Sequence, residues 1–328
     1  MLVISHEFGH FIVAKKNNIR VDEFSFGFPP KLFGIKKGET AYNFNLLPLG
    51  GYVKIYGENP DEESINGKDK TRSIANKPWY VQAGVLVAGV VMNFLVAWLL
   101  LSICLMSGLP SSTSDIPAGS NIVNPELTIT GVEKGTPADI AGLQTGDTIS
   151  HLSNQNDSTD VVSIASLTYF IRNHPNDSIT ATVTDHGQTK EIKITPTQAT
   201  PGADPTIGIS IDMIGTLKFS PAQAVWRSLK LSGSLFVGTA VGFYTLIHDS
   251  ILGHANISSL TGPIGIVGVV GDAAKFGLVY LLSFTALISI NLAVINLIPF
   301  PALDGGRLLF LLIERLKAPV SIQKFQTL

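Results

Sequence analysis

The chain has 328 residues, of which 45% are hydrophobic and 15% charged, and its formal net charge is -2. Together with a mean hydropathy of +0.31, this composition indicates an integral membrane protein whose surroundings are the lipid bilayer. It gives no indication of a nucleic-acid partner, and the single cysteine, Cys104, excludes an intrachain disulfide.

The first ten residues contain the pattern His-Glu-x-x-His, formed by His6, Glu7 and His10. On a helix, positions four apart lie on one face, so the two imidazoles can bind one tetrahedral Zn²⁺. The Glu7 carboxylate lies beside them and can accept a proton from water activated by the metal. The flanking residues are apolar on every side, which argues against two surface histidines on an amphipathic helix. We therefore predict a zinc site with Glu7 as its catalytic base.

Residues 1–14 are interpreted as the end of a first membrane helix whose beginning is missing. A cleaved signal peptide is rejected, because its apolar core has no use for a His-Glu-x-x-His pattern. Residues 15–82 are expected to be cytoplasmic. Within them, residues 40–55 alternate apolar and polar side chains before a Pro-Leu-Gly-Gly turn, which predicts an apolar, membrane-associated β-hairpin.

Two uncharged runs are long enough to cross a bilayer, at 83–109 and within 276–306. Basic residues outnumber acidic ones by eleven to eight in residues 15–78, whereas acidic residues outnumber basic ones by twelve to five in residues 108–220. By the positive-inside rule, the first region is cytoplasmic and the second is extracytoplasmic. We therefore expect a multi-pass protein of the inner (plasma) membrane.

After a linker at 110–124, residues 125–197 are expected to form an α+β domain. Strands are predicted at 127–132, 179–184 and 190–195, and helical segments near 137–142 and 163–173. The segment at 137–149 resembles the Pro-Ala-x-x-Ala-Gly-Leu-x-x-Gly-Asp-x-Ile segment of PDZ domains. A PDZ domain binds an extended peptide or a C-terminus at a sheet edge. A domain of this kind without a peptide ligand is the alternative.

Residues 198–275 are expected to form a linker and a helix, at 221–248, that lies in the membrane surface. The reason is topological. If the first helix runs inward and 83–109 runs outward, the last run must return inward for its end to meet His10. A crossing by the apolar run at 231–247 would place that end on the far side, about 30 Å away. An ordinary fourth span is the alternative.

The end of the last apolar run holds the third predicted zinc ligand, Asp304. Two prolines, Pro299 and Pro301, break the helix before it, and two glycines follow it. Asp304 alone could be a helix cap, but its expected depth in the membrane matches that of the histidines. Two histidines, one carboxylate and an open position make a catalytic zinc site. Asn291 and Asn296 are polar groups inside a membrane segment, where such groups are usually functional.

These motifs together resemble the site-2 protease family of intramembrane zinc metalloproteases. The resemblance rests on His-Glu-Phe-Gly-His and on Asn-x-x-Pro-x-Pro-x-Leu-Asp-Gly, which begins at Asn296. Three further segments, with the PDZ-like one, narrow it to the bacterial PDZ-containing group that includes the regulator of sigma-E protease. They are Phe-Gly-Phe-Pro-Pro-Lys-Leu near residue 26, Gly-Gly-Tyr-Val-Lys-Ile at 50–55 and Gly-Pro-Ile-Gly-Ile at 262–266.

The resemblance implies a polytopic α-helical membrane protein with an inserted α+β PDZ domain and a membrane-associated β-hairpin. It implies zinc-dependent cleavage of the membrane segments of single-pass proteins, such as anti-sigma factors or signal-peptide remnants. His6, His10 and Asp304 become zinc ligands, and Glu7 the general base. The residues expected to bind substrate are Asn291, Asn296, Pro299, Pro301 and Tyr52, the last in the element that matches the family's membrane-reentrant β element.

The two ends of the chain depart from the family's pattern. Five residues precede His6, where family members carry a longer apolar stretch. Residues 307–328 only begin a C-terminal region, which in the family continues into a fourth membrane helix. We therefore expect a fragment that is truncated at both ends.

Two other functions remain open. Prolines that break a membrane helix beside Asn and Asp can mark the ion site of a transporter, although the sequence shows no internal repeat of its membrane segments. A PDZ-bearing membrane scaffold without activity is the second alternative. The intact set of His6, Glu7, His10 and Asp304 argues against a scaffold.

Overall fold

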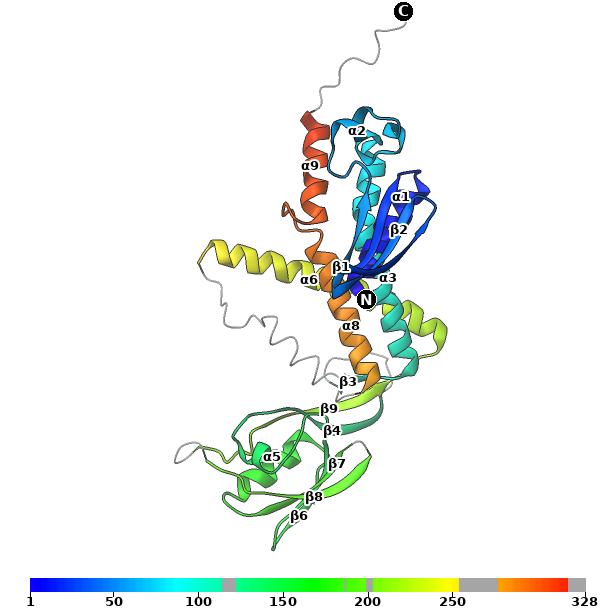
Figure 1. Ribbon diagram of the computed structural model, residues 1–328. Helices are drawn as coiled ribbons and strands as arrows, with labels where there is room; N and C mark the ends of the chain where they lie inside the picture. Colours follow the sequence, from blue (N-terminus) through cyan, green and yellow to red (C-terminus); the bar gives the residue numbers. More distant parts are fainter. Residues whose placement is uncertain (114–121, 186, 199–202, 254–276, 318–328) are drawn as a thin grey trace, which may run out of the picture. The chain divides into compact units, whose positions relative to one another are not determined.

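The computed structural model describes residues 1–113, 122–185, 187–198, 203–253 and 277–317 (Figure 1). The chain divides into two compact units. The first unit consists of Met1–Leu100, Leu229–Ala255 and Thr285–Leu328, and the second of Leu101–Ser228 and Asn256–Phe284. The Gly-Pro-Ile-Gly-Ile segment at 262–266 and the end of the region at 307–328 lie outside the described residues.

Five helices carry most of the apolar sequence: α1 (Leu2–Lys16), α3 (Trp79–Ser107), α6 (Pro221–Ile251), α8 (Leu278–Ile295) and α9 (Asp304–Lys317). Of these, α3, α6 and α8 are long and apolar enough to cross a membrane, with mean hydropathies of 2.4, 1.3 and 2.2. The chain is therefore a membrane protein with three candidate spans among the described residues. Because α6 has 31 residues, its length does not exclude a fourth span, and its placement in the membrane surface stays a prediction.

The last predicted membrane helix, at 276–306, is shorter than expected. Helix α8 ends at Ile295, and α9 begins at Asp304. Pro299 and Pro301 lie between them, and proline cannot continue an α-helix because it lacks an N–H group and its ring collides with the preceding turn. The membrane helix expected at 276–306 therefore ends at Ile295, before the two prolines that were expected to break it, and the Leu-Asp-Gly sequence opens a new helix.

Residues 15–78 contain a two-stranded sheet and three short helical turns. The strands are β1 (Val21–Lys37) and β2 (Thr40–Ile55), and the turns are α2 (Glu62–Asn66), η1 (Lys70–Arg72) and η2 (Ile74–Asn76). Residues 40–55 are extended, as expected, but their two halves do not pair with each other. Residues 51–55 pair with 21–26 on one side, and residues 41–44 pair with 23–26 on the other.

The predicted hairpin is therefore wrong in its partner. The strand that was not predicted is β1. Its Phe24, Phe26 and Phe28 also alternate with smaller or polar residues, and its residues pair with both halves of β2, which were expected to pair with each other. Both strands bend back on themselves, so that residues 31–37 pair with 40–45 as a further edge. Large hydrophobic side chains are exposed on this sheet: Phe28, Leu32, Phe33, Ile35, Leu46 and Leu47.

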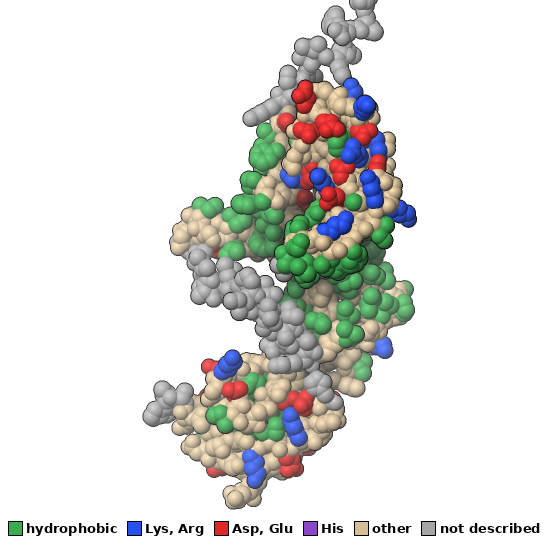
Figure 2. Space-filling view, viewed as in Figure 1, with side chains coloured by type: hydrophobic (Ala, Val, Ile, Leu, Met, Phe, Trp, Pro, Cys, Tyr) green, Lys and Arg blue, Asp and Glu red, His purple; other side chains and the backbone are tan. Residues whose placement is uncertain are grey.

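The surface of the first unit is divided by polarity. Figure 2 shows hydrophobic side chains gathered over one end of the β1–β2 sheet and charged side chains gathered around α2. An exposed apolar surface of this kind marks a site of contact with membrane or protein. The position of the β1–β2 sheet in the membrane stays a prediction.

An ion-pair cluster around Glu39 joins three segments of the first unit. Glu39, in the turn between β1 and β2, accepts hydrogen bonds from Lys15 Nζ at 2.6 Å and from Arg72 Nη2 at 2.7 Å. Arg72 and Lys15 together lower the pKa of Glu39 to about 2. At neutral pH the ionised Glu39 carboxylate therefore ties together the end of α1, the β1–β2 turn and η1.

The second unit contains an antiparallel sheet. Its strands are β3 (Leu109–Ser112), β4 (Ile122–Val132), β5 (Thr148–Ser153), β6 (Ser158–Asp160), β7 (Ile179–Asp185), β8 (Gln188–Ile194) and β9 (Ile209–Leu217). The sheet has the order β3-β9-β4-β5-β7-β8, with β6 paired to β5. Two helices accompany it, α4 (Pro137–Ile140) and α5 (Ile164–Asn173). The predicted strands and helices of this domain are confirmed, and β5, β6 and β9 are additional.

The predicted limits of this domain, 125–197, are too narrow. Strand β9 pairs with β4 along most of its length, and β3 pairs with β9 on the other side. Both strands lie in segments that were expected to be linkers. The cause is long-range pairing, because β9 completes the sheet only by lying beside a strand that is far away in sequence.

The segment at 137–149 forms α4, a tight turn and the start of β5. Gly142 and Gly146 have φ angles of +84° and +99°, a conformation that side chains other than glycine rarely adopt. Asp147 is buried and accepts a hydrogen bond from the Gln144 N–H at 3.0 Å. The glycines and the aspartate of the motif are thus explained by backbone geometry.

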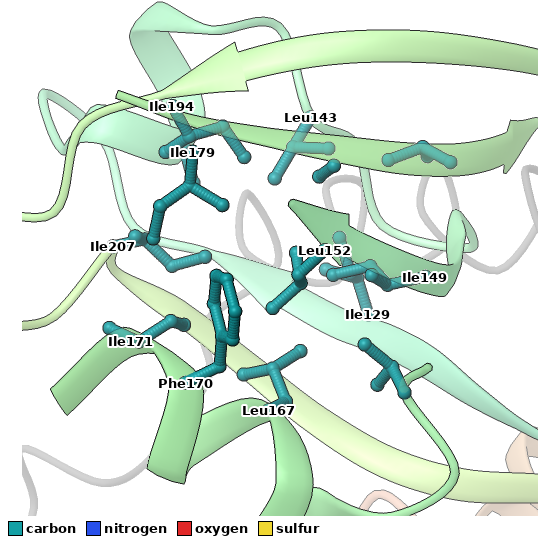
Figure 3. Close-up of a cluster of buried hydrophobic side chains, with 14 of the residues drawn as sticks. Ile129, Leu143, Ile149, Leu152, Leu167, Phe170, Ile171, Ile179, Ile194 and Ile207 are labelled. Carbon is teal, nitrogen blue, oxygen red and sulfur yellow. The ribbon is translucent and has the colours of Figure 1, made fainter. Parts of the chain in front are cut away.

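The core of the second unit lies between α5 and the sheet (Figure 3). Leu167, Phe170 and Ile171 are buried on one face of α5, and they pack with residues of the sheet such as Leu152 and Ile179. Tyr169, their neighbour in sequence, is 72% exposed. The amphipathic helix α5 therefore covers the apolar face of the sheet.

We expect Phe170→Ala to destabilise the second unit by about 3–5 kcal/mol, because it leaves a cavity in a closely packed core. Tyr169→Ala is the matched control and should change stability by less than about 0.5 kcal/mol, since the Tyr169 side chain faces solvent. The stability of both variants is measured by unfolding the intact protein in denaturant and monitoring protease cleavage within residues 122–217. Equal protection of the two variants would contradict this assignment of the core.

Candidate metal centre

The two histidines of α1 lie close to α3 because glycines, which have no side chain, occupy the contact between the two helices. His6 and His10 are 7% and 6% exposed. A Cβ atom at Gly9 would collide with the Ala88 carbonyl of α3, and a Cβ atom at Gly89 would lie 2.5 Å from His10 Nε2. Glycine at both positions lets the helix backbones approach and leaves room for the imidazole rings.

Asp304 is held by a tight loop between α8 and α9. The Gly305 N–H donates to the Asn296 carbonyl at 2.7 Å, and the Leu303 N–H donates to the Phe300 carbonyl at 2.9 Å. Cβ atoms at Gly305 and Gly306 would collide with carbonyl groups of this loop. The two glycines therefore allow the loop to fold over the first turn of α9, where Asp304 begins the helix.

The structure brings His6, His10 and Asp304 together, as the sequence predicted. Asp304 Oδ2 lies 2.9 Å from His6 Nε2 and 3.3 Å from His10 Nε2. The two Nε2 atoms are 3.1 Å apart. Donor atoms bound to one tetrahedral zinc ion lie about 3.3 Å apart, since each is about 2.0–2.1 Å from the metal. The spacing fits one zinc ion.

The hydrogen bonds around His10 test whether these residues fit a metal. His10 Nδ1 lies 2.7 Å from the Val85 carbonyl, which can only accept, so Nδ1 carries the proton. In the neutral ring, Nε2 then has a free lone pair directed at Asp304. Asp304 Oδ2 is buried and has no hydrogen-bond partner. Lone pairs that face one another in a buried site repel unless a cation lies between them, so the donor set fits zinc.

Glu7 is held on the β-sheet side of α1. Its Oε2 atom accepts a hydrogen bond from the Val53 N–H of β2 at 3.0 Å. Residues 51–55 of β2 therefore run beside the helix that carries the histidines, and Gly51 lies next to Ile4. The Glu7 carboxylate is half-buried, with one oxygen fixed by the sheet.

The residues that were expected to bind substrate have other roles in the described structure. Tyr52 donates its hydroxyl proton to Glu23 Oε2 at 2.9 Å, and Asn291 Oδ1 accepts from Thr239 Oγ1 at 3.2 Å. Asn296 contributes its backbone carbonyl to the loop before Asp304.

The remaining two expected substrate-binding residues, Pro299 and Pro301, are exposed in that loop. Contact of any of the five with substrate stays a prediction.

Three residues of α3 contribute to the site and were not predicted from sequence. Val85 accepts from His10, Gly89 lies beneath both rings, and the Asn93 side chain lies 3.4 Å from His6 Nδ1. Positions 85, 89 and 93 are four apart and share one face of α3. Asn93 could have been found by the same signal that marked Asn291, a polar residue inside a membrane segment.

Comparison with known proteins also indicates a metallopeptidase, and the similarity extends over the whole chain. A model of peptidase family M50 matches residues 1–328. Zinc metalloprotease RasP of Shouchella clausii is 27% identical, over 99% of this chain and 90% of RasP. Regulator of sigma-W protease RasP of Bacillus subtilis is also 27% identical, over 98% and 90%. A candidate zinc metalloprotease of Synechocystis sp. is 35% identical, over 99% and 85%.

Among solved structures, the PDZ domain of the SdrC-like protein from Listeria monocytogenes matches with a TM-score of 0.23 and 17% identity. The match covers 28% of this chain and 92% of that domain. At this TM-score the match does not decide the fold. The PDZ interpretation of the second unit therefore depends on the segment at 137–149 and on the order of its strands and helices.

We expect Gly89→Ala to reduce zinc binding strongly, because the added methyl group would occupy space beside His10 Nε2. Gly84→Ala on the same helix is the matched control, since a Cβ atom at Gly84 meets nothing within 4 Å. Zinc content after dialysis against a weak chelator measures both. Equal zinc content in the two variants would show that the metal lies elsewhere.

Proposed function

The chain belongs to peptidase family M50, and we propose that it cleaves membrane segments of single-pass proteins at a zinc ion held by His6, His10 and Asp304. The observation that carries this proposal is the convergence of three ligand atoms, all within 4.8 Å of one another, from the first and last parts of the described chain. A membrane-embedded peptidase of this family fits the three candidate spans. Family membership argues against the transporter and the scaffold.

Each side chain has a separate task in this reaction. When bound, zinc acts as a Lewis acid on water and on the scissile carbonyl. Glu7 accepts the proton of the attacking water and delivers it to the leaving amine. Its hydrogen bond from the Val53 N–H fixes one carboxylate oxygen, so the other is free for proton transfer. Burial of the site excludes bulk water, which strengthens these interactions.

The β1–β2 sheet supports a proposal for how substrate is held. A membrane helix hides its peptide bonds in i→i−4 hydrogen bonds, so the substrate must unwind before cleavage. Residues 51–55 of β2 form an edge of the sheet beside α1. An unwound segment that pairs with groups of this edge other than the Val53 N–H, which holds Glu7, would regain part of its hydrogen bonds beside the helix of the histidines.

The proposed substrate-binding residues come from two parts of the first unit. Tyr52 belongs to the edge strand, and Asn291 and Asn296 belong to α8 and the following loop. Asn296 would bind one backbone group of the extended substrate. The second unit is proposed to bind a peptide or C-terminus and to admit substrates whose extracytoplasmic domain has already been removed.

The direction of the helices supports a topology in which α6 does not cross the membrane. Ser289 of α8 donates to the Asn93 carbonyl of α3 at 2.8 Å, and Cys104 of α3 donates to the Val279 carbonyl of α8 at 3.4 Å. Later residues of α3 thus meet earlier residues of α8, so the two helices are antiparallel. If α3 runs outward, α8 returns inward, and Asp304 lies in the cytoplasmic half with the histidines.

Glu7→Gln should lower the rate of cleavage of a reporter membrane segment by about 10²-fold or more, because only the proton acceptor is lost. The amide oxygen of glutamine can still accept from Val53 N, so folding and zinc content should stay as in the wild type. Asp304→Ala is the contrasting variant and should lose zinc as well as activity. Cleavage by Glu7→Gln at near the wild-type rate would exclude Glu7 as the base.

A cysteine at position 158 should react with a membrane-impermeant reagent on intact cells, whereas a cysteine at position 68 should not. Ser158 and Lys68 are both exposed in their own units, so the difference reports only the side of the membrane. The charge split between 15–78 and 108–220 predicts this result. Cys104 is first changed to Ser, and labelling at position 68 alone would invert the topology.

A further inference from the structure

We propose that Asn93 is a positioning residue for the zinc ligand His6, and this inference rests on the proposed function. Its side-chain oxygen accepts a hydrogen bond from Nδ1 of His6 and so keeps Nε2 free for the metal. The Asn93 side chain is 0% exposed on α3, in a helix of candidate membrane-spanning length. A buried amide in such a helix is costly unless it is hydrogen-bonded.

The orientation of the Asn93 amide decides which of its atoms meets His6. With Nδ2 directed at His6 Nδ1, at 3.4 Å, the amide oxygen is buried and has no partner. The oxygen and nitrogen of an Asn amide have nearly the same shape, so their assignment follows from the hydrogen bonds they can make. Turning the amide by 180° places Oδ1 beside His6 Nδ1, which then donates to it, so the amide oxygen gains a hydrogen-bond partner.

The chemistry of His6 requires the same orientation. If Asn93 donated, Nδ1 of a neutral His6 would be the unprotonated nitrogen, and the proton would lie on Nε2. Nε2 faces Asp304 Oδ2 at 2.9 Å and His10 Nε2 at 3.1 Å, where a proton would block metal binding. With Oδ1 as acceptor, the proton lies on Nδ1, and the Nε2 lone pair joins that of His10.

In this arrangement each of the two histidines donates a hydrogen bond to an acceptor on α3. His10 donates to the Val85 carbonyl and His6 donates to Asn93, eight residues later, with Gly89 between them. At position 93 the backbone carbonyl is already used, because it accepts from Ser289 at 2.8 Å. A side-chain acceptor is therefore needed for His6, and Asn93 supplies it.

The experiment compares zinc affinity in three variants of the intact protein by competition with a chelator. Asn93→Leu keeps the size of the side chain and removes the acceptor, so zinc should bind about 10–100-fold more weakly, as for other outer-shell partners of metal-bound histidine. Asn93→Asp keeps an acceptor and should retain zinc affinity. Ser102→Ala, a buried polar residue elsewhere on α3, is the matched control and should bind zinc as the wild type does.

The outcomes separate this inference from the proposed function. A wild-type protein that binds no zinc would overturn the proposed function, whereas equal zinc affinity of wild type and Asn93→Leu would overturn only the role of Asn93. Loss of zinc in both Asn93 variants would also overturn it. Nitrogen-15 NMR of labelled histidine in the wild-type zinc protein gives a test without substitution. A protonated Nδ1 on His6 is expected, and a proton on Nε2 would contradict the inference.

Discussion

Every part of the metal centre depends on how closely α1 and α3 approach each other. Gly9 and Gly89 allow the two backbones to meet, so that the imidazoles reach their acceptors on α3 without intervening water. In the apolar interior of a membrane, a polar group without a protein partner is costly, and this close approach is what provides the partners. The contact of Ser289 with the Asn93 carbonyl then fixes α8 against the same helix, and α8 leads to Asp304.

The β1–β2 sheet extends this arrangement toward the substrate. The Val53 N–H holds Glu7, so the strand edge and the proposed catalytic base are parts of one hydrogen-bonded unit. A shift of the edge strand would therefore move the base as well. The exposed aromatic and aliphatic side chains of the sheet face away from the packed interior, which suits an element that lies against lipid rather than water.

The sequence predicted which residues meet at the candidate metal centre, and it predicted the pairing of the β-strands less well, for physical reasons. His6 and His10 could be found from local spacing, because a helix places them on one face, and Asp304 from the prolines and glycines around it. The pairing of β1 with both halves of β2 could not, because alternation identifies a strand but not its neighbour. The same limit applies to β9, whose partner β4 lies far away in the chain. Asn93 was missed because its function depends on a histidine of another helix.

The distance along the chain between the two halves of the metal centre has a consequence for biogenesis. His6 and His10 are synthesised before α3, whereas Asp304 emerges from the ribosome only after α3, the second unit, α6 and α8. The nascent protein therefore has an incomplete ligand set throughout its insertion. Its own apolar helices, and those of proteins inserted beside it, pass through the membrane before a peptidase can exist. The order of the chain therefore delays assembly of the full ligand set until the segment with Asp304 has been made.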